Sequence, residues 1–153
     1  MENIQIRKAI LADMPVLLAF EQGIVTAERP FDNSLKEGTI HYYDIAAMIA
    51  ASDVEVLVAQ YNGQVIGSGY ARIREAKPYL KFPKLAYLGF MYVDPAHRGK
   101  GVNKLIIAGL KAWAIEQGMV EMRLDVYADN ETAVKAYEKA GFSKNLIEMR
   151  LPL

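Results

Sequence analysis

The residues from His97 to Lys104 combine two glycines with basic side chains, at the point where an apolar segment gives way to a helical pattern. Gly99 and Gly101 carry no Cβ that would keep an anion away from the main-chain amides. The first amides of a helix lack acceptors within the helix and lie at the positive end of its dipole. The stretch therefore predicts a binding site for phosphate or another anion.

Residue types alone leave a second interpretation open. A strand-to-helix turn needs glycine for its geometry, and Arg98, Lys100 and Lys104 can simply form a solvated basic face. Two familiar phosphate-binding motifs are excluded. No hydroxyl residue follows Lys100, as a P-loop requires, and Asn103 breaks the glycine spacing of a dinucleotide-binding fingerprint.

A second pattern, N-x-x-A-x-x-x-Y-x-x-x-G-F, stands downstream and consists of Asn130, Ala133, Tyr137, Gly141 and Phe142. The glycine stretch itself fits [QR]-x-x-G-x-[GA] from Arg98 onward, except that Asn103 takes the last place. With these two motifs and an Ile-Arg-x-Ala opening at residues 6–9, the chain resembles the GNAT superfamily of acetyl-CoA-dependent N-acetyltransferases over essentially its whole length.

The resemblance implies a cofactor site built mostly from main chain. In the family, amides of the glycine loop bind the pyrophosphate of coenzyme A, and the end of the preceding strand pairs with the pantetheine amides. The residues at these and the neighbouring cofactor positions are Met91, Tyr92, Val93, Arg98, Gly99, Lys100, Gly101, Val102, Asn103, Asn130, Ala133 and Tyr137. The co-substrate is acetyl-CoA, and no metal is expected.

Acetyl transfer to an amine needs a neutral nitrogen nucleophile, a polarised carbonyl and a proton for the departing thiolate. The helical pattern alone allows Tyr137 to be a core-facing aromatic residue. The resemblance implies instead that Tyr137 is the general acid toward the thiolate. A main-chain N–H near Met91 is expected to polarise the carbonyl.

The general base is left open by the sequence. Many relatives carry a glutamate on the strand that corresponds to residues 85–93, but this segment contains no carboxylate here. We predict Glu75, just after a hairpin strand, as the catalytic base. The other candidates, each of which can also be solvated or structural, are Asp125, Glu28, His41 and a water molecule.

Acidic and aromatic residues are interleaved in the loops that follow the first predicted helix, and they predict a site for a cationic, partly apolar amine. The residues assigned to substrate binding are Glu28, Phe31, Tyr42 and Tyr43, with Asp32 and Asp44 nearby. Tyrosines also fill cores, so a structural role stays open. Ser68 lies inside a predicted strand and not at a nucleophile elbow, which favours direct transfer in a ternary complex over a covalent acyl-enzyme.

The chain as a whole is neutral, with 153 residues, 18 Lys+Arg, 18 Asp+Glu and no cysteine. This is the length of one domain, and neutrality argues against a general binder of nucleic acid or anionic membranes. With two histidines and no cysteine, the sequence argues against a zinc site. No apolar signal-peptide core or membrane span is visible, so we expect a cytoplasmic protein.

The elements that must position these residues alternate between strands and helices. The predicted elements are a strand at 4–7, a helix from 13, a helix over 34–51, strands at 54–61, 64–73 and 85–93, a helix over 102–117, a strand at 120–127, a helix over 130–140 and a strand at 146–151. Asn62-Gly63 favours a type I′ hairpin turn. We predict an α/β fold, GNAT-like, with a central twisted mixed sheet flanked by helices on both faces, in a single domain over residues 1–153.

These observations predict an N-acetyltransferase that moves the acetyl group of acetyl-CoA to a small-molecule or peptide amine. One alternative is a non-catalytic acyl-CoA sensor or interaction module, which the missing strand carboxylate motivates. Another is a nucleotide-phosphate binder of unrelated chemistry. Relatives often dimerise through C-terminal strands, so the resemblance and the apolar ending at residues 146–153 together predict a homodimer.

Overall fold

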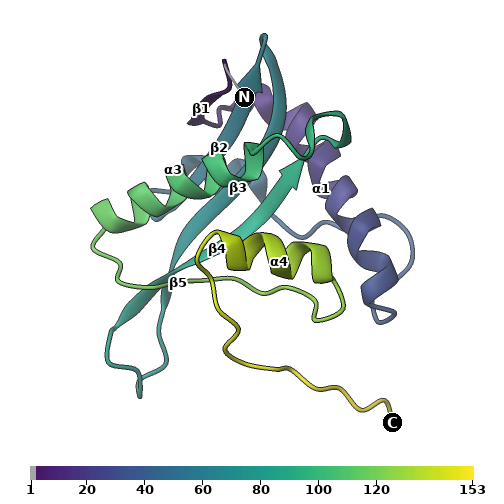
Figure 1. Ribbon diagram of the computed structural model, residues 1–153, viewed down its shortest axis with the longest axis vertical. Helices are drawn as coiled ribbons and strands as arrows, with labels where there is room; N and C mark the ends of the chain where they lie inside the picture. Colours follow the sequence, from purple (N-terminus) through teal and green to yellow (C-terminus); the bar gives the residue numbers. More distant parts are fainter. Residues whose placement is uncertain (1–2) are drawn as a thin grey trace.

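The computed structural model describes residues 3–153, which form one five-stranded sheet with helices packed around it (Figure 1). The strands are β1 (Gln5–Lys8), β2 (Val54–Tyr61), β3 (Gln64–Glu75), β4 (Lys84–Val93) and β5 (Met122–Arg123). The α-helices are α1 (Met14–Glu28), α2 (Ile45–Ala50), α3 (Val102–Glu116) and α4 (Glu131–Lys139). Short 3-10 helices occur at η1 (Leu11–Asp13), η2 (Arg29–Phe31) and η3 (Pro95–His97). Among the described residues, no helix has the length and apolar character that crossing a membrane requires.

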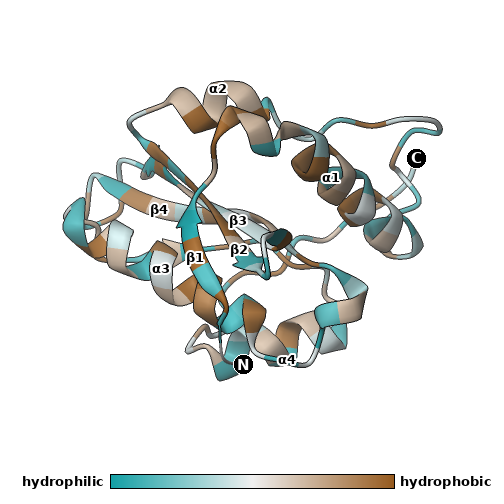
Figure 2. Ribbon diagram, turned by 90° about the horizontal axis from the view of Figure 1, so that it is seen from above, coloured by the Kyte–Doolittle hydropathy of each residue, from teal (hydrophilic) through white to brown (hydrophobic). Residues whose placement is uncertain are grey.

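The sheet is mixed and both of its faces are covered. The strand order is β1-β2-β3-β4-β5, antiparallel throughout except for the parallel β4–β5 pair. Helices α1 and α2 lie on one face, and α3 and α4 lie on the other (Figure 2). Alternation along β2 separates the two cores, since Val56 and Val58 pack toward α1 and α2 while Leu57 packs toward α3. The predicted α/β fold with helices on both faces is confirmed.

The β2–β3 hairpin and α3 follow their sequence patterns closely. Asn62 and Gly63 have φ values of 50° and 77°, both positive as the predicted type I′ turn requires. The apolar stripe of α3 is buried, with Val102, Ile106 and Leu110 at most 2% exposed. Because β3 pairs with β4 and α3 packs on β2, β3 and β4, these two elements together support β4.

The helix predicted over residues 34–51 is wrong in length, because only Ile45–Ala50 is helical. The preceding segment is held by side chains instead of a helical hydrogen-bond ladder. Glu21 on α1 is fully buried, and its carboxylate accepts hydrogen bonds from the amides of Tyr42 and Tyr43 at 2.9 Å each. The side-chain amide of Gln22 donates through Nε2 to the main-chain carbonyl of Ile40 at 2.8 Å. These contacts provide hydrogen-bond partners for main-chain groups of residues 40–43 and hold this loop against α1.

Two predicted strands differ from the structure. The segment predicted at 120–127 pairs with β4 only through β5. Among the described residues of the tail, none from Leu146 to Leu151 lies in a strand, and its large apolar side chains are at least 82% exposed. A strand needs a neighbouring edge to receive its hydrogen bonds, whereas this tail runs away from the sheet (Figure 1). The guanidinium of Arg150 anchors the tail by donating to Asp32 at 2.9 Å.

Candidate active site

An irregular point in β4 marks the centre of the candidate site. Phe90 has a φ of 55° although it is not glycine, and it is only 1% exposed. The pairing register with β3 shifts at the same place, so β4 bulges between Gly89 and Tyr92. A buried non-glycine residue in the left-handed region is uncommon and points to a local function.

Within residues 3–153, the edge of β4 that faces β5 has no strand partner along the bulge and the residues on either side of it. In the described chain, β5 pairs with β4 only at Ala86 and Tyr87. The following residues, from Leu88 to Val93, therefore present main-chain groups on that edge without a strand partner. An extended ligand with amide groups can pair there as an additional strand would.

The loop between β4 and α3 has the geometry of an anion site. Gly99 and Gly101 have φ values of 75° and 81°, and in the described structure a Cβ on either would meet no heavy atom within 4 Å. Gly101 directly precedes α3, whose first amides have no acceptor within the helix. The space around the loop is thus open where its N–H groups and the positive end of α3 converge.

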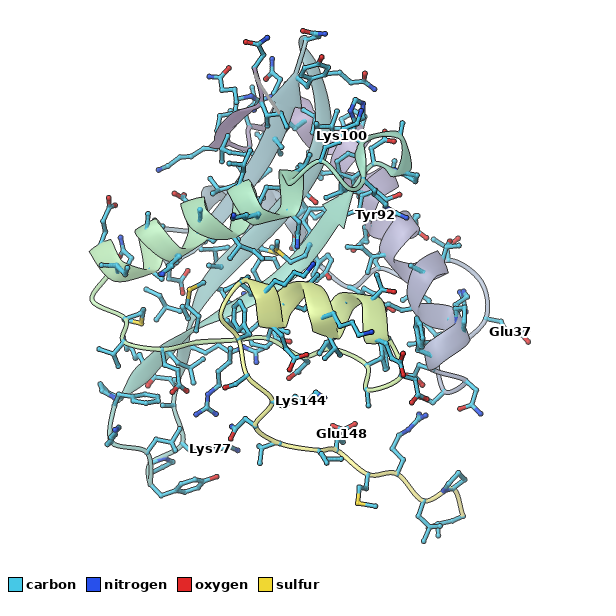
Figure 3. All side chains as sticks on the ribbon, viewed as in Figure 1. Glu37, Lys77, Tyr92, Lys100, Lys144 and Glu148 are labelled. Carbon is cyan, nitrogen blue, oxygen red and sulfur yellow. The ribbon has the colours of Figure 1, made fainter. Side chains whose placement is uncertain are left out.

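Arg98 ties this loop to the end of β4. Its Nε donates to the carbonyl of Val93 at 3.0 Å, and its guanidinium carbon lies 5.5 Å from the ring centroid of Tyr92. Tyr92 and Lys100 lie at the same end of the molecule, beside the start of α3 (Figure 3). The open edge of β4 and the glycine loop therefore form adjacent parts of one surface, which suits a ligand with both amides and phosphates.

Tyr137 on α4 reaches the α3 side of this surface. Asn130 caps α4, because its side-chain oxygen accepts from the amide of Ala133 at 3.3 Å. The Tyr137 ring packs against the α3-side core, as Met91 also does, and it meets Phe142 edge to face with a centroid distance of 5.9 Å. Burial, with a smaller contribution from the charge of Glu28, raises the pKa of Tyr137 to about 12. Its hydroxyl is thus a protonated donor at neutral pH.

The predicted acceptor residues lie on the opposite, α1–α2 side. Tyr43 sits against the bulge, with ring centroids 5.1 Å from Phe90 and 5.7 Å from Tyr70. The Tyr42 hydroxyl is buried next to the Glu28 carboxylate, but it makes no hydrogen bond of good geometry within residues 3–153. Burial and then the charge of Glu28 raise the pKa of Tyr42 to about 12. An unpaired hydroxyl beside a carboxylate is an arrangement that a ligand amine can satisfy.

Glu28 itself has an environment that disfavours its charge. Burial, together with the nearby charge of Asp32, raises the pKa of Glu28 above its ordinary value. Phe31 stacks on Tyr127 with a centroid distance of 6.2 Å, and the Tyr127 hydroxyl donates to Asp32 at 2.7 Å. These contacts fix the end of α1 against the segment that follows β5, and Glu28, the last residue of α1, is partly buried there.

The structure does not bring Glu75 to this site. Glu75 is exposed and pairs with Lys84, whereas the bulge follows the Tyr70–Gly89 pair. Five strand positions separate these pairs, about 17 Å at roughly 3.3 Å per residue. Lys77, which follows shortly after Glu75, lies at the far end of the molecule from Lys100 (Figure 3).

The remaining base candidates have partners of their own. The Asp125 carboxylate accepts from the Tyr87 hydroxyl at 3.1 Å, and His41 Nδ1 lies 2.8 Å from the carboxylate of Glu21. Three residues that shape the site escaped the sequence analysis: Glu21, Tyr70 and Tyr127. Only Glu21 carried a signal, as a lone carboxylate on the apolar face of α1.

The mixed sheet, the open β4 edge and the glycine loop at the start of α3 agree with the class that the sequence motifs indicate, the acyltransferases. The sequence profile of the acetyltransferase (GNAT) family matches residues 22–142, and the chain belongs to that family. The resemblance seen in the motifs of the glycine loop and α4 is thereby confirmed.

The comparisons with individual proteins agree. Aminoglycoside N(6′)-acetyltransferase type 1 of Stenotrophomonas maltophilia is 26% identical over 102 residues, which cover 63% of this chain and 65% of that protein. A tetramutant protein from Bacillus halodurans superposes with a TM-score of 0.87 at 21% identity, over 97% of this chain and 99% of the other. A predicted acetyltransferase from Clostridium acetobutylicum, solved with acetyl-CoA, gives a TM-score of 0.72 at 20% identity over 97% and 96%. At these identities the solved structures show the fold alone.

Proposed function

We propose that this protein transfers the acetyl group of acetyl-CoA to a primary amine by direct attack within a ternary complex. The observation that carries the proposal is the β4 bulge at Phe90, placed between an open strand edge and the glycine loop on one side and the Glu28–Tyr43 region on the other. Acetyl-CoA supplies an activated thioester and a thiol leaving group. Names of the matched relatives include acetyltransferases of aminoglycosides and of streptothricin, which supports an amine acceptor.

The residues that would hold the co-substrate fit its chemistry. Amides from Arg98 to Asn103 suit the pyrophosphate, and the β4 edge from Met91 to Val93 suits the pantetheine amides. Asn130, whose side chain caps α4 by accepting from the amide of Ala133, and Ala133 itself are the further positions that the family resemblance assigns to the co-substrate. Because the glycines leave the space above the loop open, phosphate oxygens can approach these amides closely.

The reaction then needs a donor for the sulfur and a donor for the carbonyl oxygen. The Tyr137 hydroxyl gives its proton to the departing sulfur, since its raised pKa keeps it protonated. A main-chain N–H near Met91 polarises the acetyl carbonyl, because the bulge releases that amide from regular pairing. No covalent acyl-enzyme is needed.

Glu28 replaces Glu75 as the proposed proton acceptor. A carboxylate whose pKa is raised toward neutrality is a stronger base than an exposed one and can take the proton of the attacking amine directly or through water. Tyr42 and Tyr43, whose rings meet edge to face, form the aromatic wall against which the amine is oriented, and Phe31, stacked on Tyr127, adds an aromatic ring just after α1. The predicted substrate residues thus receive distinct roles.

Two further properties stay proposals: residence in the cytoplasm and assembly as a homodimer. The exposed apolar side chains between Leu146 and Leu153 support the second, because apolar side chains gathered at one segment favour contact with another surface.

The test is thiol release from acetyl-CoA in the presence of amines, polyamines, amino acids and N-terminal peptides. We expect at least one class to release thiol well above the rate of hydrolysis. Tight binding of acetyl-CoA without amine-dependent release would favour the sensor alternative. Displacement of acetyl-CoA by ATP at comparable affinity would favour the nucleotide-binding alternative.

A further inference from the structure

Two arginines, Arg72 and Arg74, project from β3 on the α1–α2 face of the sheet. Between them, Ile73 packs into the opposite, α3-side core, so alternation places both arginines on the acceptor side. The Cζ atom of Arg74 lies 3.6 Å from the ring centroid of Tyr87, and that of Arg72 lies 5.8 Å from the centroid of Tyr70. The rings support the planar guanidinium groups and leave their N–H edges available.

Neither guanidinium is neutralised by a carboxylate. The ion pairs formed within residues 3–153 include neither Arg72 nor Arg74. Asp44 and Asp53 line the same pocket. The Asp44 carboxylate also accepts from the amide of Ala47 at 3.2 Å as the cap of α2, and within residues 3–153 neither Asp44 nor Asp53 forms an ion pair with an arginine. Two guanidinium groups on one wall of a pocket, both without ionic partners, are suited to an anionic ligand.

The pocket that these arginines line has a volume of about 390 Å³, within the range of small-molecule sites. Tyr42 and Tyr43 form a second part of its wall. Tyr70 forms the part next to β4, where its hydroxyl would lie 2.5 Å from a Cβ added at Gly89. Since Gly89 directly precedes the bulge, the pocket lies beside the point at which acetyl transfer is proposed.

We propose that this pocket binds a carboxylate of the acceptor, so that the acceptor is an amine that also carries a carboxylate, as an amino acid does. Arg72 and Arg74 present paired N–H donors that match the two oxygens of a carboxylate. Tyr42 belongs both to this pocket and to the neighbourhood of Glu28, which places an amine at one end and an anion at the other. The inference rests on the proposed acetyl transfer and specifies its substrate class.

The kinetic test compares acceptors in matched sets: an α-amino acid with its amide and its decarboxylated amine, phosphoethanolamine with ethanolamine, and kanamycin as a polycation. We expect kcat/KM to be at least about tenfold higher for the carboxylate-bearing member.

Arg72→Gln and Arg74→Gln each raise the KM for that acceptor about tenfold and leave the KM for acetyl-CoA unchanged, while Arg72→Lys retains part of the preference. The control Lys111→Gln, at an exposed position of α3, changes neither constant. A preference for the phosphate compound, the decarboxylated amine or kanamycin overturns the assignment.

A second readout does not depend on turnover. The Nε–Hε NMR signals of Arg72 and Arg74, identified through the two Gln variants, are followed while the amino acid or its decarboxylated amine is added to the folded protein. Shifts with the amino acid alone support the anion site even if no thiol is ever released, in which case only the transfer proposal fails. No shift with any carboxylate-bearing amine, in protein that binds acetyl-CoA, overturns the anion site itself.

Discussion

At the scale of single residues, the opposite tasks proposed for Tyr137 and Glu28 follow from one physical effect. Burial disfavours the charged form of both groups, which holds the pKa of Tyr137 at about 12 and raises the pKa of Glu28 above its ordinary value. A phenol that stays protonated is a proton donor, and a carboxylate that binds protons more readily is a better acceptor. The two residues contribute from the two faces of the sheet.

Replacement of Tyr137 by phenylalanine tests the donor. We expect Tyr137→Phe to lower kcat by roughly 10²-fold and to leave the affinity for acetyl-CoA nearly unchanged, because only the proton donor is removed. Steady-state kinetics and calorimetric binding measure the two quantities. Tyr79→Phe, at a position 81% exposed, is the matched control and should change neither. An unchanged kcat, with chemistry shown to be rate-limiting, would remove Tyr137 from the mechanism.

The sequence predicts those site residues that belong to local motifs and misses those that depend on the fold. Gly99, Gly101 and Tyr137 stand in patterns with fixed spacing, and the structure gives both glycines a positive φ before α3 and packs Tyr137 against the α3-side core. Tyr70 and Tyr127 belong to no such pattern, because their roles arise only when β3 and the segment after β5 meet distant partners. The base depends on the same long-range placement: Glu75 lies away from the bulge, and Glu28 is our proposal in its place.

At the scale of elements, the proposed binding of acetyl-CoA depends most on the start of α3. Gly101 precedes the helix in a left-handed conformation, with open space in the described structure where a side chain would stand. That space lies over the free amides, so a ligand phosphate and a side chain would compete for it.

We expect Gly101→Val to weaken acetyl-CoA binding by at least about tenfold. Gly118→Val is the matched control, because Gly118 follows the other end of α3 with nearly the same φ, 80° against 81°, and equally open surroundings. Both variants should lose about 1–3 kcal/mol of unfolding free energy from backbone strain, measured in urea. Equal acetyl-CoA affinity in the two variants would mean that the loop has a structural role only.

Elements with strong periodicity are predictable, and elements defined by partners are not. The hairpin and α3 carry patterns that are complete within the segment, and both form as predicted. The loop before α2 is held by the buried carboxylate of Glu21, which a pattern within residues 34–44 cannot reveal. The strand predicted at 146–151 has the composition of a strand but no sheet edge beside it in the described chain, so it stays extended and exposed.

At the scale of the whole molecule, zero net charge is the sum of separate local fields. Basic residues gather at the glycine loop, Arg72 and Arg74 line the acceptor pocket, and Glu28 and Asp32 lie at the end of α1. A neutral chain can therefore present an anion-binding surface for coenzyme A and a mixed surface for an acceptor. Net charge excludes general polyanion binding but says nothing against a single anionic ligand.

The buried tyrosines predict a loss of stability at high pH. Burial raises the pKa of Tyr42, Tyr87 and Tyr137 to about 12, and it raises those of Tyr43 and Tyr127 as well. In the unfolded chain these phenols titrate near a pKa of about 10. Above about pH 10 the unfolded state thus releases protons that the folded state still binds, so the unfolding free energy falls as pH rises.

Urea denaturation between about pH 8 and pH 11 measures this effect. We expect a total fall of the order of 1–2 kcal/mol across the upper part of the range, limited because solvent screens the exposed parts of the rings. Tyr43→Phe should make the fall shallower, whereas the exposed-site variant Tyr79→Phe should not. A flat unfolding free energy up to about pH 11 would contradict the burial of these hydroxyls.

The most direct test of the central claim is mass spectrometry of the acceptor after incubation with acetyl-CoA and the protein, with free thiol measured in the same sample. Direct transfer predicts that the acceptor gains the mass of one acetyl group, in equal amount to the thiol released, while the protein's own mass stays unchanged at every time point. Thiol release without acetylated acceptor, or an acetylated protein that accumulates before product, would contradict the account.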